Sequence, residues 1–175
     1  MVLETERLLL RTLETCDAPA MTVLLNDPAI NNMMDDYPYP YTEGDAQRVI
    51  HWAQDALGAG NGWGLAILRK VDRLFLGALF LKLYTPVPEI GYWVGRAFWG
   101  QGYVTEAARG IVRYAFDELG LGKIAAYCLV QNVASQRVLE KLGMRYVSRE
   151  EYPVPHSPRV DVLLYWELQR EDWKS

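Results

Sequence analysis

An amphipathic helix in the middle of the sequence limits the folds open to this chain. Apolar residues recur every three or four positions from Val104 to Leu119, and Gly120 follows as a C-terminal helix stop. Three β-like runs precede that helix, over residues 63–69, 74–84 and 89–95. Antiparallel hairpins followed by a crossover helix indicate a mixed α/β sheet.

The remaining periodic segments extend this sheet and cover it. Helices are expected from Thr15 or Asp17, over 43–57 behind a Thr42 cap, and from Ala134 to Leu142, and further strands over 7–13, 123–130, 144–149 and 160–168. We predict an α/β fold of mixed, α+β-like character, with a central, mostly antiparallel sheet of seven strands flanked by about four helices. The sequence shows no internal repeat or linker, so residues 1–175 are expected to form a single domain.

The composition favours a packed, slightly acidic domain. Of the 175 residues, 50% are hydrophobic and 23% are charged, which allows a substantial core. The formal net charge is −4 and no Lys/Arg run occurs, which argues against nucleic acid as a partner, because phosphate-backbone binding normally needs a basic face. Cys16 and Cys128 lie far apart and form no disulfide framework, so a reducing compartment is expected.

Targeting and metal-binding signals are also missing from the sequence. The N-terminus lacks the basic start and apolar core of a signal peptide, and no apolar run approaches the roughly 20 residues that span a bilayer. The two histidines and two cysteines have no metal-ligand spacing. We therefore expect a cytoplasmic protein with no membrane partner and no metal, acting as a monomer or a homodimer.

A glycine-rich turn joins the third β-like run to the long helix. Glycines stand at positions 95, 100 and 102, and a strand-to-helix turn leaves the first helix amides without intrachain partners. These amides and the helix dipole would form an anion site, although a tight turn with glycines for geometry alone explains the same pattern. A dinucleotide-binding fingerprint lacks its third glycine here, and the Gly-Lys-Ser/Thr of a P-loop is absent.

The residues around this turn resemble the cofactor motif of the GNAT superfamily of N-acetyltransferases, and more narrowly its ribosomal-protein-alanine acetyltransferase (RimJ/RimL-like) branch. The resemblance rests on Glu89-Ile-Gly-Tyr-Trp-Val-Gly, Trp99-Gly-Gln-Gly-Tyr-Val-Thr-Glu-Ala, Glu4-Thr-Glu-Arg-Leu-Leu-Leu-Arg, Asn132-Val-Ala-Ser and Val138-Leu-Glu-Lys-Leu-Gly-Met. It spans nearly the whole chain and implies the acyl-CoA N-acyltransferase fold with acetyl-CoA as cosubstrate. One departure is Ala97, where the superfamily often has Gln or Arg.

The resemblance also implies which residues contact the cofactor. Backbone amides of the loop would bind the pyrophosphate, the strand before it would pair with the pantetheine arm, and the Asn-x-x-Ser segment would add side-chain contacts. The residues concerned are Gly100, Gln101, Gly102, Tyr103, Val104 and Thr105 in the loop, Tyr92, Trp93 and Val94 in the strand, and Asn132 and Ser135. Ordinary packing is the competing explanation for Trp93.

Acetyl transfer to an amine needs a base and a proton donor for the departing thiolate. An α-amino group, with a pKa of about 7.7–8.0, loses its proton far more readily than lysine, at about 10.4, so a modest base suffices for an N-terminus. Glu89 is the candidate base, directly or through water, against the alternative of a solvated carboxylate at a strand end. Ser135 is the candidate donor by resemblance, because a serine at this Asn-x-x-Ser position lies near the sulfur in the resembled branch, and an ordinary first-turn serine is the alternative. The position of the superfamily's usual tyrosine holds Leu139, which leaves Ser135 or direct release of the thiolate. Cys128, mid-strand among apolar residues, is expected in the core.

These residues together predict an N-acetyltransferase that moves an acetyl group from acetyl-CoA to a primary amine by direct transfer in a ternary complex. The acceptor is a protein N-terminal α-amine, as the resembled branch implies, or a small amine such as an amino acid, a polyamine or an antibiotic. A non-catalytic acyl-CoA-binding or sensing domain is the alternative from another class. A nucleotide-dependent oxidoreductase is disfavoured by the absent third glycine.

Overall fold

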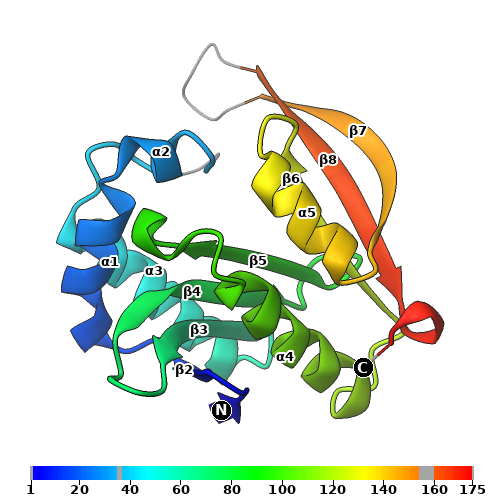
Figure 1. Cartoon of the computed structure of the whole chain (residues 1–175), viewed down its shortest axis with the longest axis horizontal. Helices are drawn as coiled ribbons and strands as arrows, with labels where there is room; N and C mark the ends of the chain where they lie inside the picture. The colour runs from blue at the N-terminus through cyan, green and yellow to red at the C-terminus, as the bar shows by residue number, and fades with distance from the viewer. Residues whose placement is uncertain (1, 35–36, 154–159, 175) are drawn as a thin grey trace.

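The computed structural model describes residues 2–34, 37–153 and 160–174 (Figure 1). The strands are β1 (Val2–Glu4), β2 (Leu8–Thr12), β3 (Gly62–Arg69), β4 (Phe75–Lys82), β5 (Glu89–Val94), β6 (Lys123–Leu129), β7 (Arg145–Pro153) and β8 (Val160–Gln169). The helices are α1 (Ala18–Leu25), α2 (Pro28–Asn31), α3 (Glu43–Gly58), α4 (Tyr103–Asp117) and α5 (Val133–Lys141), with short 3₁₀ turns at Thr15–Asp17, Arg96–Phe98 and Arg170–Asp172. Within the described residues, no helix is long and apolar enough to cross a membrane.

All strands join one sheet in the order β1-β2-β3-β4-β5-β6-β8-β7. Every neighbouring pair is antiparallel except β5 and β6, which are parallel and are connected by the crossover helix α4. Helices α4 and α5 lie in front of the sheet in Figure 1, and α3 lies behind it. The mixed, mostly antiparallel α/β fold expected from the sequence is confirmed.

The numbers of strands and helices expected from the sequence were each too low by one. The described residues form eight strands, because Val2–Glu4 adds a short edge strand to β2 that is too brief to show a period in the sequence. They form five α-helices, because Asp27 accepts a hydrogen bond from the amide of Ala29 and caps a further short helix that starts at Pro28. From the sequence, Asn26-Asp27-Pro28 indicates only that the first helix ends or is interrupted here.

Two apolar layers hold the helices to the sheet. The layer under α4 and α5 contains the fully buried Ile111 and Phe116 of α4, which confirms the apolar stripe expected for that helix. The layer under α1 and α3 contains Met21 and Ile50. Trp93 also belongs to this second layer, whereas the next residue, Val94, belongs to the first. Successive side chains of β5 therefore point to opposite faces of the sheet.

Candidate active site

Strands β5 and β6 separate after a single point of pairing. Glu89 is in register with Ala125, and the Ala125 amide donates to the carbonyl of Pro88 at 2.7 Å. Beyond this point β5 stays paired along its other edge with β4, from Lys82 to Gly77, whereas no further register pair joins it to β6 among the described strands. The sheet therefore opens between two parallel strands, and one edge of β5 is left without a partner strand.

Ser135 and Tyr92 meet across this opening on the α4–α5 face. Ser135 is in the first turn of α5, where its amide donates to the Oδ1 atom of Asn132 at 3.0 Å, as a helix cap. The hydroxyl oxygens of Ser135 and Tyr92 are 3.0 Å apart, and either can be the donor. Burial raises the pKa of Tyr92, so its hydroxyl keeps its proton at neutral pH.

Cys128 lies on β6 near this pair of hydroxyls. Its thiol is buried, as expected from the sequence, and burial raises the pKa of Cys128 to about 11. A thiol with so high a pKa is almost fully protonated at neutral pH, so it is a poor nucleophile. The sulfur therefore contributes packing at this position rather than a covalent step.

Glu89 lies on the opposite face of the sheet from Ser135. Side chains alternate along a strand, and Ile90 and Val94 point into the α4–α5 layer, so Glu89 and Trp93 point to the α1–α3 face. The Glu89 carboxyl is half-buried, and burial raises its pKa, an effect that Lys82 only partly offsets. The structure thus brings both candidate catalytic residues to the opening between β5 and β6, but on its two sides rather than in contact.

Two tyrosines share the Glu89 face and were not singled out from the sequence. The rings of Tyr127 on β6 and Tyr165 on β8 stack with centroids 4.8 Å apart. The Tyr165 hydroxyl donates to the Oε1 atom of Glu167 at 2.6 Å, and Lys123 pairs with the same oxygen at 2.8 Å. Burial raises the pKa of Tyr127, and the carboxylates of Glu150, Glu89 and Glu167 raise it further. No sequence pattern connects Tyr127 and Tyr165, because their strands pair in the sheet but are separated by β7 along the chain.

Two side-chain hydrogen bonds stabilise the conformation of the glycine-rich loop between β5 and α4. The Trp99 indole donates to the carbonyl of Val94 at 2.9 Å, and the Gln101 side chain donates to the carbonyl of Ala97 at 2.9 Å. Gly100 and Gly102 adopt φ values of 73° and 80°, a region that favours glycine. A Cβ at Gly100 would meet no atom within 4 Å, so nothing obstructs the approach of a ligand to the loop backbone there.

The first turn of α4 completes an anion-binding arrangement. Gly102 is the N-cap, and the Glu106 amide makes the first helical hydrogen bond to its carbonyl at 3.0 Å. The amides of Tyr103, Val104 and Thr105 therefore precede any intrahelical acceptor and remain available, as at other helix N-termini. The loop therefore offers free backbone amides to an anion, and Ala97 contributes no polar side chain there.

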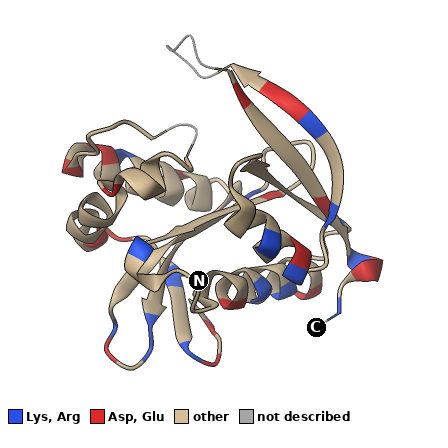
Figure 2. Cartoon of the chain, turned by 45° about the horizontal axis from the view of Figure 1, so that its top comes forward, with Lys and Arg blue, Asp and Glu red and all other residues tan. Residues whose placement is uncertain are grey.

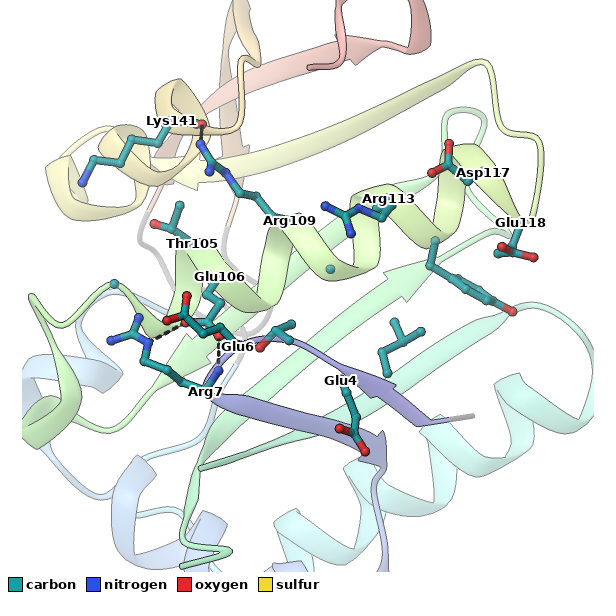
Figure 3. A pocket seen from close by; sticks show the side chains of 15 residues that line it. Glu4, Glu6, Arg7, Thr105, Glu106, Arg109, Arg113, Asp117, Glu118 and Lys141 are labelled. Carbon is teal, nitrogen blue, oxygen red and sulfur yellow. Dashed lines mark hydrogen bonds and ion pairs between the residues drawn. The ribbon is translucent and has the colours of Figure 1, made fainter. Parts of the chain in front are cut away.

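Arg7 is a residue of this region to which the sequence assigned no role. It lies within the N-terminal motif of the resemblance and contacts both the loop and α4, 94 and 99 residues away along the chain. A groove of about 860 Å³ runs from Gly102 along the exposed side of α4, and Arg7, Arg109 and Lys141 line it (Figure 3). Figure 2 shows that basic and acidic residues are interspersed along α4 and α5, so the groove carries mixed charge. Among the described residues, no group of three metal-ligating side chains occurs.

The side chains of Trp93 and Asn132 already make contacts within the protein, and these contacts limit which of their atoms can bind a cofactor. The Trp93 side chain is buried against Phe75, with ring centroids 6.1 Å apart, on the face away from α4. Packing thus accounts for this side chain, and only its backbone is left for a ligand. Asn132 uses its Oδ1 atom to cap α5, so its amide nitrogen is the donor that remains.

Gly102→Ala is expected to weaken acetyl-CoA binding and to lower Tm by about 2–4 °C. An alanine at this φ costs about 1 kcal/mol, and its Cβ would lie 3.5 Å from the Nη2 atom of Arg7. Gly120→Ala is the matched control, since Gly120 has φ 67° with no atom within 4 Å of a built Cβ and lies beyond the far end of α4. Calorimetric titration and thermal unfolding should show similar Tm losses in both variants but weaker binding only in Gly102→Ala. Equal binding by the two variants would contradict a ligand at this loop.

A mixed sheet that opens between two parallel strands, beside a glycine-rich loop at a helix N-terminus, is the arrangement expected of the acyl-CoA N-acyltransferase fold. The family model of the acetyltransferase (GNAT) domain matches residues 7–145 of this chain. The chain therefore belongs to the GNAT acetyltransferase family, and it is an acetyl-CoA-dependent N-acetyltransferase.

Individual relatives agree with this assignment. The FsC-acetyl coenzyme A-N(2)-transacetylase of Aspergillus fumigatus is 30% identical over 162 residues, which are 84% of this chain and 67% of that protein. The crystal structure of a GNAT-family acetyltransferase from Bacillus anthracis has a TM-score of 0.86 and 25% identity, covering 98% of this chain and 99% of that one. Mycobacterium smegmatis RimJ in complex with CoA-disulfide has a TM-score of 0.85 at 19% identity, covering 100% and 90% of the two chains, and shares the fold.

Proposed function

We propose that this chain transfers the acetyl group of acetyl-CoA directly to a primary amine within a ternary complex. The observation that carries the proposal is the opening between β5 and β6, with Ser135 on one face and Glu89 on the other. A cofactor arriving from the α4–α5 face and an amine arriving from the α1–α3 face would meet at this opening. Direct transfer then needs no acylated residue of the enzyme.

The cofactor would lie along the loop and the unpaired edge of β5. The amides of residues 101–105 bind its pyrophosphate, and the β5 backbone from Tyr92 to Val94 pairs with the pantetheine arm. The amide nitrogen of Asn132 adds a further donor. Acetyl-CoA supplies an acetyl group activated as a thioester, and these residues hold it in one orientation. The support for this placement is the open space at Gly100 and the missing partner strand of β5.

Glu89 and Ser135 would move the two protons of the reaction. Glu89 accepts a proton from the attacking amine, directly or through water, and its raised pKa brings it closer to that of the amine than an ordinary carboxylate. Ser135 passes a proton to the departing sulfur and regains one from solvent through the Tyr92 hydroxyl, 3.0 Å away, while Glu89 releases the proton of the amine to solvent. Leu139, at the position of the superfamily's usual tyrosine, is buried and cannot donate a proton. The hydroxyl pair of Ser135 and Tyr92 supports Ser135 as the donor in its place.

Two classes of acceptor are compatible with this chemistry. A protein N-terminal α-amine is favoured by its low pKa, which suits a carboxylate base. A small-molecule amine is favoured by the relative at 30% identity, which is named for transfer to an N(2) position. Tyr127 and Tyr165, on the same face as Glu89, would border either acceptor.

An amine panel tests the proposed function and separates the acceptor classes. Release of free thiol from acetyl-CoA is followed with N-terminal peptides, amino acids, polyamines and amine antibiotics, and product masses identify the acetylated nitrogen. Turnover with peptides and not with small amines assigns the first class, and the reverse assigns the second. Acetyl-CoA binding without turnover of any amine would contradict the proposal.

We also propose a reducing compartment such as the cytoplasm for this enzyme. Cys16 is exposed in a 3₁₀ turn, and Cys128 is buried in β6, and both are free thiols. Free thiols persist where the surroundings are reducing. Fractionation of cells followed by activity measurement tests this location.

A further inference from the structure

Arg7 connects the N-terminal segment to the end of the glycine-rich turn and to the start of α4. Its Nε atom pairs with the Oε2 atom of Glu106 at 2.7 Å, and its own amide donates to Oε1 of the same carboxylate at 2.7 Å. Its Nη1 atom donates to the carbonyl of Gln101 at 3.1 Å, and its guanidinium lies 4.6 Å from the ring centroid of Tyr103. Figure 3 shows Arg7 beside Glu106 at the start of α4. One side chain thus holds the residue before Gly102 and the first turn of the helix after it.

The contact with Gln101 determines where the next amide points. In a planar trans peptide, the carbonyl of one residue and the amide hydrogen of the next are directed to opposite sides. By holding the Gln101 carbonyl, Arg7 turns the Gly102 amide away from itself. That amide belongs to the loop where the anion site is proposed, so Arg7 fixes the orientation of one of its donors.

The contact with Glu106 has an electrostatic consequence. Burial would raise the pKa of Glu106, but hydrogen bonds from Thr5 and Arg7 outweigh this effect and lower it, so the carboxylate is ionised at neutral pH. The Thr5 hydroxyl donates to it at 2.5 Å. An uncompensated carboxylate in the first turn of α4 would repel a pyrophosphate bound at the same turn, and Arg7 supplies the compensating charge.

We propose that Arg7 is a positioning residue for the pyrophosphate of acetyl-CoA. It orients the Gly102 amide through the Gln101 carbonyl and neutralises Glu106 beside the same site. This inference rests on the proposed position of the cofactor at the loop. It requires no contact between Arg7 and the ligand.

Arg7→Gln tests this inference by calorimetric titration with CoA and with 3′-dephospho-CoA, which keeps the pyrophosphate. We expect Kd to rise about tenfold for both ligands, with the loss appearing in Kd and in KM for acetyl-CoA rather than in kcat. Arg7→Lys retains the charge but cannot span both partners, so an intermediate loss is expected. Arg113→Gln is the matched control, because Arg113 lines the same groove, and its loss should change Kd less than about twofold. A loss confined to CoA would show that Arg7 acts on the 3′-phosphate and would overturn the proposal.

The double variant Arg7→Gln/Glu106→Gln separates the two effects. Removing both charges restores the electrostatic balance but leaves the Gln101 carbonyl unheld, so Kd should recover only in part. Complete recovery would overturn the orienting role. Thermal unfolding without ligand identifies variants that fail to fold. If Arg7→Gln fails to fold, the Kd of Arg7→Lys tests the inference instead. If Gly102→Ala weakens binding and Arg7→Gln does not, only this inference fails, whereas wild-type binding by both variants would contradict the cofactor position itself.

Discussion

Ser135→Ala is expected to lower kcat about 100-fold while changing the Kd for acetyl-CoA by less than about threefold. A positioned proton donor contributes about 10²–10⁴-fold to a proton-transfer step. The substitution removes the hydroxyl that lies 3.0 Å from Tyr92 but keeps the amide that Asn132 caps, so α5 should remain intact. Steady-state kinetics with the best acceptor of the amine panel, and calorimetric titration with acetyl-CoA in the absence of acceptor, measure the two quantities.

Two further variants test whether a loss of turnover in Ser135→Ala is specific to the Ser135 hydroxyl. Ser148→Ala removes a serine hydroxyl on β7 that donates to Glu150 at 3.1 Å, and its turnover should match that of the wild type. Tyr92→Phe should reduce kcat by a smaller factor than Ser135→Ala, because it removes the second donor and keeps the first. Wild-type turnover in Ser135→Ala would exclude Ser135 as the donor, and a large loss in Tyr92→Phe would then assign that role to the tyrosine.

Glu89→Gln is expected to lower kcat/KM about 100-fold on the acid side of neutrality, with a deficit that shrinks as pH passes the pKa of the acceptor amine. Glu89 is a base only when ionised, and burial raises its pKa above the ordinary value of about 4.3. Wild-type kcat/KM should therefore rise with pH through that raised pKa and again toward the amine pKa. The variant should lose the first rise and keep the second. Rate profiles that begin below the ordinary carboxylate pKa of about 4.3 and extend to pH 9, with an α-amine acceptor, display both limbs.

The stability of this variant provides an internal control. A carboxyl whose pKa is raised by folding stabilises the protein while protonated, below its unfolded pKa, and that contribution is lost as pH rises through the folded pKa. At neutral pH, Glu89→Gln should therefore hold or raise Tm, so a kinetic loss cannot come from unfolding. Glu150→Gln removes a carboxylate that also faces Tyr127 and should leave the shape of the pH profile unchanged. An identical profile in wild type and Glu89→Gln would exclude Glu89 as the base.

Much of the fold was predictable because its elements carry local patterns. The stripe of α4 and the Thr42 cap of α3 depend on residues within a few positions of one another, and both were recognised from the sequence. The short β1 and α2 were missed, since Val2–Glu4 and Pro28–Asn31 are too short to show a period. The insertion of β8 between β6 and β7 could not be predicted, because strand order depends on which edges pair in three dimensions.

The candidate site also contains one part that the sequence predicts and another that it does not. The loop from Trp99 to Tyr103 was recognisable because its glycines and the helix that follows are adjacent in sequence, and a helix N-terminus exposes the same amides wherever it occurs. The side-chain partners of the site come from distant segments. Tyr92 reaches Ser135 across 43 positions, and no spacing rule connects them.

The sequence by itself determined the class of this protein: a mixed sheet, a glycine-rich loop before an amphipathic helix, and membership of an acetyl-CoA-dependent family. The mixed sheet and the loop follow from short-range chemistry, in which periodicity, capping and glycine conformation act between neighbours, whereas the family is what the resemblance of motifs across nearly the whole chain implies. Only the tertiary structure decided that Glu89 and Ser135 lie on opposite faces of one opening, and that Arg7 holds a carbonyl 94 residues away. Those relations depend on how strands alternate their side chains and on which surfaces pack together, and packing joins residues regardless of their separation along the chain.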